Sequence, residues 1–82
     1  MEFVTHLLTD AGDRAWSALG AKNQLWVHIN MAEKNLVVGV RRKYVSNAMD
    51  YIKTIKSSLS DADYDFIYKL LSKSFLLLNS LL

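Results

Sequence analysis

The sequence predicts a single domain over residues 1–82 of the α+β class, mostly helical, with one β-hairpin among three helices. Three observations lead to this prediction. The chain has 82 residues, enough for one domain and too few for two. Apolar side chains recur at helical spacing in three stretches, and a central stretch alternates with period two. A small all-α bundle is the alternative, because the central stretch also fits helical spacing.

A first helix is predicted over residues 2–19. Its apolar side chains recur at three- and four-residue intervals, which places them on one helical face. They are Val4, Leu7, Leu8, Ala11, Ala15, Ala18 and Leu19. Gly20 follows at the position where a glycine commonly ends a helix. The helix is therefore expected to stop at residue 19.

Residues 25–41 are the ambiguous part of the chain. Residues 25–30 and 36–40 alternate with period two and are rich in β-branched side chains, as strands are. The five residues between the two runs are a common hairpin length. The same segment also has apolar residues at helical spacing, namely Leu25, Ile29, Ala32, Leu36 and Val40. Gly39 and the β-branched residues favour the hairpin, and one helix stays open as the alternative.

Two further helices are predicted over residues 44–59 and 61–81. The first has a single apolar stripe with polar side chains covering the rest. Ser60 stands where an N-cap is expected, because its hydroxyl can accept a hydrogen bond from the amide of Asp63. Asp61, Asp63 and Asp65 add negative charge near the positive end of the helix dipole.

The last helix carries more apolar surface than one neighbouring helix can cover. Phe66, Leu76 and Leu77 lie outside its main apolar stripe, and a helix that is apolar on several faces is normally covered on several sides. Small chains without disulfides are often stabilised by oligomerisation. These three residues are therefore predicted to form the interface of a homo-oligomer, most simply a homodimer.

No motif for catalysis, cofactor binding or metal binding is present. The chain has no cysteine, and neither His6 nor His28 has a partner at the spacing of a metal site. The glycines are too far apart to form a phosphate loop. We therefore predict a protein that is not an enzyme, with no cofactor and no metal. Missing cysteines and a missing signal-peptide pattern favour a cytoplasmic location, and no apolar run is long enough for a membrane span.

Five residues are predicted to bind a partner. On the hairpin interpretation, Trp26 and His28 share the outer face of the first strand, near the basic triplet Arg41, Arg42 and Lys43 at the junction with the next helix. Tryptophan and arginine are enriched in binding hot spots, and cations ahead of a helix can hold an anion. The alternative is that the triplet binds nothing and only keeps this junction exposed to water. The predicted function is a small regulatory or interaction protein, an inhibitor or adaptor in type, that binds another protein.

The alternative function is a small dimeric DNA-binding transcriptional regulator. The predicted order over residues 36–82 is strand, helix, turn, helix, which resembles the ribbon-helix-helix family of dimeric proteins that read the major groove. The sequence departs from that family, because Val37 and Gly39 stand where base-reading polar side chains are needed. The formal net charge is +2, which is small for a DNA reader. Nucleic acid is therefore the second candidate partner.

Overall fold

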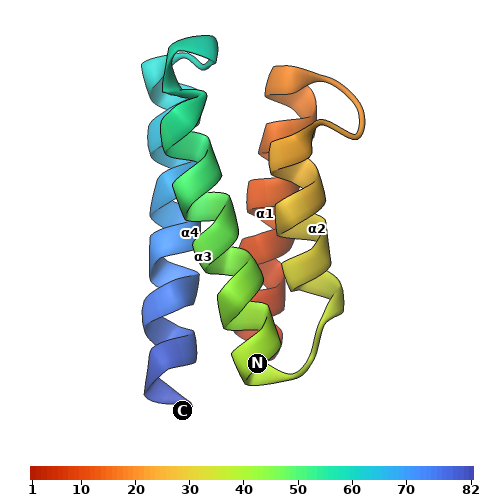
Figure 1. Ribbon diagram of the computed structural model, residues 1–82, viewed down its shortest axis with the longest axis vertical. Helices are drawn as coiled ribbons and strands as arrows, with labels where there is room; N and C mark the ends of the chain where they lie inside the picture. Colours follow the sequence, from red (N-terminus) through yellow and green to blue (C-terminus); the bar gives the residue numbers. More distant parts are fainter.

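The computed structural model describes all residues 1–82 as a bundle of four helices joined by short connections (Figure 1). The helices are α1 (Glu2–Leu19), α2 (Gln24–Lys34), α3 (Val38–Thr54) and α4 (Asp61–Ser80), with a 3₁₀ turn at Lys56–Ser58 before α4. α1 packs against α2 and α4, and α3 packs against the same two helices. None of the helices is both long and apolar enough to cross a membrane.

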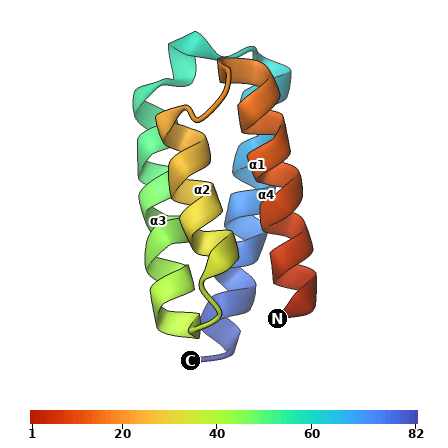
Figure 2. The same cartoon turned by 90° about the vertical axis from the view of Figure 1, so that its right-hand side faces the viewer.

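The helices run alternately up and down, so the connections fall at two ends of the bundle. Figures 1 and 2 show both chain termini and the α2–α3 connection at one end. The α1–α2 and α3–α4 connections lie at the other end. This arrangement follows from an even number of helices with short connections.

The predicted α+β class is wrong, because residues 25–41 form no hairpin and the chain contains no strand. They form α2, a short extended connection and the first turn of α3. Leu25, Ile29 and Ala32 are fully buried, and they lie on one face only if the segment is helical. The period-two pattern was therefore a coincidence of composition, and the all-α alternative fits.

Asn23 determines where α2 begins. Its Oδ1 accepts a hydrogen bond from the amide of Trp26 at 2.7 Å, as an N-cap does. Its Nδ2 donates to the carbonyl oxygens of Ala15 at 2.9 Å and Gly20 at 2.7 Å. Gly20 has φ +95°, a backbone conformation that L side chains rarely adopt. The predicted end of the first helix at residue 19 is confirmed, and one side chain joins it to the next helix.

The other boundaries agree with the sequence in part. The last helix is confirmed, and Ser60 caps it by accepting a hydrogen bond from the amide of Asp63 at 3.1 Å. The helix predicted over residues 44–59 begins earlier, at Val38, and ends earlier, at Thr54. Its start is earlier because Arg41 continues the buried stripe of Val45 and Ala48 toward the N-terminus.

The core runs along the axis of the bundle and takes side chains from every helix. Its members are fully or almost fully buried. They are Val4, Leu8, Ala11 and Ala15 of α1, Leu25, Ile29 and Ala32 of α2, Val45, Ala48 and Ile52 of α3, and Ile67, Leu71 and Leu78 of α4. Small residues let α1 approach α2 closely: a Cβ at Gly12 would lie 3.4 Å from Cγ2 of Ile29. No buried side-chain nitrogen or oxygen lacks a hydrogen-bond partner.

Arg41 is the one charged side chain inside the bundle, and it closes the core at the end that holds the chain termini. It is fully buried. Its Nε donates to the carbonyl oxygen of Ala32 at 2.9 Å, and a terminal nitrogen donates to that of Glu33, so it caps the last turn of α2. The other terminal nitrogen donates to Oγ1 of Thr5 at 2.9 Å. Burial lowers the pKa of Arg41 and nearby Glu33 opposes that shift, but a guanidinium stays protonated at neutral pH.

A second polar contact joins α1 to α4 near the opposite end. Nε of Arg14 donates to Oδ1 of Asp63 at 2.7 Å, in the only ion pair of the structure. The guanidinium also lies over the ring of Phe66, 4.4 Å from its centroid. The hydrogen bond from Arg14 lowers the pKa of Asp63; slight burial opposes this, and the Ser60 hydroxyl adds to it.

Replacing Arg41 by Ala should lower the free energy of unfolding by roughly 2–4 kcal/mol, because buried carbonyl groups lose their donors. The free energy of unfolding of Arg41→Lys should fall between those of the wild type and Arg41→Ala, because one ammonium cannot reach both α1 and α2. Urea unfolding followed by circular dichroism measures both. Lys43→Ala, at an exposed residue of the same helix, is the control, with a change within about 0.5 kcal/mol. Equal stability of Arg41→Ala and wild type would show that the buried guanidinium contributes nothing.

The contact of Asp63 should make stability depend on pH. Because the folded carboxyl has the lower pKa, its contribution is complete above the ordinary pKa of about 3.9 and is lost as pH falls through the folded value. Asp63→Asn should therefore lower the urea midpoint at pH 7, and its difference from the wild type should shrink as the pH falls from about 3.9 toward about 2, because protonation removes the charge of Asp63. Asp65→Asn removes a nearby carboxylate that has no ion pair and is the control. An equal difference in urea midpoint between the wild type and Asp63→Asn at both pH values would contradict this explanation.

Candidate interaction surface

The five residues predicted to bind a partner do not form one surface. Residues two apart on a helix point about 200° apart, so Trp26 and His28 lie on opposite flanks of α2. Trp26 packs edge-on against Trp16 of α1, with ring centroids 4.8 Å apart. His28 faces Tyr51 of α3, with ring centroids 5.6 Å apart. Arg41 is inside the bundle, so only Arg42 and Lys43 of the basic triplet reach the surface.

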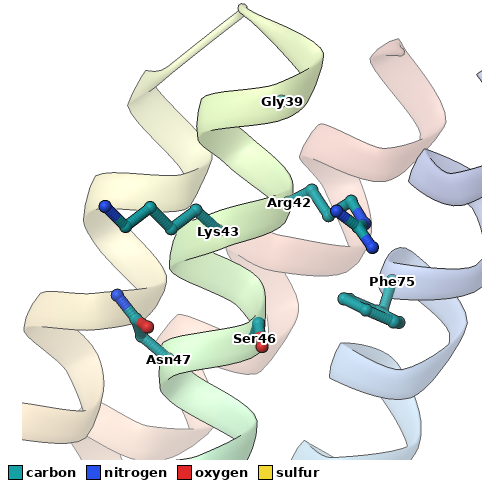
Figure 3. A pocket seen from close by; sticks show the side chains of 6 residues that line it. All are labelled: Gly39, Arg42, Lys43, Ser46, Asn47 and Phe75. Carbon is teal, nitrogen blue, oxygen red and sulfur yellow. The ribbon is translucent and has the colours of Figure 1, made fainter. Parts of the chain in front are cut away.

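Arg42 and Lys43 border a hollow on the outer side of α3 (Figure 3). It measures about 360 Å³ and is lined by Gly39, Arg42, Lys43, Ser46, Asn47 and Phe75. Figure 3 shows Lys43 and Asn47 reaching to one side of α3, while Arg42 reaches toward Phe75 of α4. The guanidinium carbon of Arg42 lies 5.1 Å from the centroid of the Phe75 ring, and Nε donates to Oδ1 of Asn79. No carboxylate lines the hollow, and neither cation has an ion-pair partner.

The three residues predicted to form an oligomer interface have different environments. Leu77 is half-buried and packs against the core. Phe66 is 40% exposed and lies beneath the guanidinium of Arg14. Leu76 is 66% exposed, beside a hollow that it shares with Lys69 and Lys73 on the outer face of α4. Self-association through this face stays a prediction, and Leu76 is the residue on which it now depends.

The largest group of exposed apolar side chains was not predicted from the sequence. It lies at the end of the bundle that holds both termini and the α2–α3 connection, and we call it the apolar end (Figures 1 and 2). Its members are Met1, Phe3, Met31, Leu36, Val37, Val40, Leu81 and Leu82. The other exposed large hydrophobics are only Trp16, Phe66 and Leu76. Leu36 and Val37, in the connection, are 74% and 64% exposed.

Charge is distributed unevenly along the bundle. The half that includes the apolar end, residues 1–9, 29–46 and 71–82, has five basic residues and two acidic ones, Glu2 and Glu33. Its basic residues are Lys34, Arg41, Arg42, Lys43 and Lys73. The opposite half has six aspartates against five basic residues. The positive excess of the protein therefore lies around the apolar end.

The surface offers contacts for binding and no group of side chains arranged for catalysis. No three histidine, aspartate or glutamate side chains come together in a way that could hold a metal ion. The only side-chain hydrogen bond of a histidine joins His28 to Gln24, which does not form a triad of nucleophile, base and orienting group. No protein-family model, curated protein or solved structure matches this chain. The apolar end and the charges around it are therefore the features of this surface that bear on function.

Leu76→Lys should reduce self-association if the outer face of α4 forms the interface, because a buried lysine would lose its hydration. The mass measured by light scattering is expected to fall from that of a dimer to that of one chain. The helical circular dichroism spectrum should be unchanged, since Leu76 touches none of the core. Lys34→Ala, at an exposed residue of α2, which does not pack against α4, is the control. A wild type that is already monomeric at high concentration would contradict the oligomer prediction.

Proposed function

We propose that this protein is a non-enzymatic interaction protein of the regulatory or adaptor type, and that its apolar end contacts the partner. One observation carries the proposal: eight of the eleven exposed large hydrophobic side chains lie at one end of a bundle whose core is complete without them. Exposed apolar patches on small proteins commonly mark interaction sites. An inhibitor or adaptor acts by occupying a surface, which requires no catalytic group.

The position of these residues also supports the proposal. Leu36 and Val37 belong to a connection that has no packing role, yet they are two of the most exposed apolar residues. A connection is usually polar because it faces water, so apolar residues there point to a binding role. DNA reading has less support, because the ribbon is absent and Arg41 is buried within the fold.

Site-specific crosslinking tests the proposal. A photo-reactive amino acid replaces Val37 at the apolar end, and in a matched variant it replaces Ser57, an exposed residue at the opposite end. In cells of the source organism, Val37 is expected to give a discrete adduct that Ser57 does not give. Excess wild-type protein should suppress the adduct, and excess Leu36→Asp, Leu81→Asp protein should not, because its apolar end is disrupted.

Two results would contradict the proposal. Identical adducts from both positions would show that contact is not localised at the apolar end. No adduct from Val37 to either protein or lipid would show that this end has no partner, and the proposal would then be abandoned.

A further inference from the structure

We propose that the surface on which the apolar end docks is an anionic lipid bilayer. This inference rests on the proposed function, since it names the partner of the same end. It is argued from three properties of that end: the shape in which the apolar residues are presented, the charge around them, and the hollow beside them.

The apolar residues of this end are exposed and line none of the main hollows of the surface. These hollows lie along the sides of the helices. A protein partner would have to supply a pocket that fits these irregular tips. The interfacial region of a bilayer accepts projecting apolar side chains of any outline, because lipids rearrange around them.

Four accessible cations lie within about two helical turns of the apolar end. Lys34 ends α2, Arg42 and Lys43 lie in the first two turns of α3, and Lys73 lies two turns before the end of α4. Basic side chains beside inserted apolar residues are attracted by anionic lipid headgroups. A second copy of this chain would bring the same cations end to end, and like charges would oppose that contact. The charge therefore favours an anionic surface over self-association at this end.

The hollow on α3 is bordered by two cations that are placed to meet headgroup phosphates. Gly39, the first of its lining residues along the chain, directly precedes Val40 of the apolar end. Arg42 and Lys43 have no carboxylate partner there, and they reach to opposite sides of α3 (Figure 3), so each cation is presented to a separate headgroup phosphate. Apolar tips in the acyl boundary and cations at the level of the phosphates are the two contacts that peripheral membrane proteins combine.

Vesicle co-sedimentation of the full chain tests this inference. Vesicles of phosphatidylcholine alone are compared with vesicles containing phosphatidylserine, at low and at physiological salt. The protein is expected to bind only the anionic vesicles, and more weakly at higher salt. Arg42→Ala with Lys43→Ala should lower the partition coefficient on the order of 30-fold, taking about fivefold for each cation near the surface. Leu36→Ser with Val37→Ser should lower it on the order of tenfold or more.

The matched control is Lys53→Ala with Lys56→Ala, which removes two exposed cations at the opposite end. It should bind as the wild type does, and circular dichroism checks that every variant is folded. Absence of binding to anionic vesicles at low salt would overturn the inference, as would equal loss from the control. If Val37 crosslinks to a protein while vesicles are not bound, the lipid inference fails and the proposed function stands.

Discussion

Moving a guanidinium out of water costs much free energy. Arg41 is accommodated inside this bundle because each of its three guanidinium nitrogens donates a hydrogen bond. The acceptors belong to the end of α2 and the beginning of α1, so one side chain of α3 joins three helices. These hydrogen bonds form a polar layer that closes the core at this end. Leu36 and Val37 lie in the connection just before α3 and cannot enter the core past this layer. The exposure of Leu36 and Val37 is thus consistent with the burial of Arg41.

The spacing of apolar residues in the sequence indicates that Arg41 is buried. Because Arg41 belongs to a basic triplet, it was instead predicted to lie at the surface. Positions 41, 45, 48 and 52 follow helical spacing, and the last three are the apolar stripe of α3. Continuing that stripe by one turn would have placed Arg41 inside and started the helix earlier. The hairpin prediction failed for a related reason: residues 25–41 satisfy both periods, so local pattern could not decide between them. The decision was made by contacts distant in sequence, such as the burial of Ile29 against α1 and the reach of Arg41 to Thr5.

The candidate site was harder to predict than the fold, because its residues are close together only in the folded chain. Phe3, Leu36 and Leu81 are far apart in the sequence, and nothing in their neighbourhood marks them as a group. An up-and-down bundle of four helices brings the first residues, the second connection and the last residues to one end. Predicting two strands where the chain forms the single helix α2 added one element and hid this relation, since it changed which connections share an end. For the same reason, Trp26 and His28 were predicted to share one face of a strand, whereas on the helix α2 they lie on opposite flanks.

The two ends of the bundle differ in how their side chains are used within the fold. Near the opposite end, Asn23 and the Arg14–Asp63 pair use their polar groups within the fold. At the apolar end, Arg41 is used within the fold in the same way, but Leu36, Val37, Arg42 and Lys43 contribute little to the core. Their side chains could be changed with little effect on packing, so selection on stability does not explain why they are apolar or basic. A requirement for contact outside the chain explains both, and the uneven charge would turn this end toward an anionic surface before any apolar residue touched it.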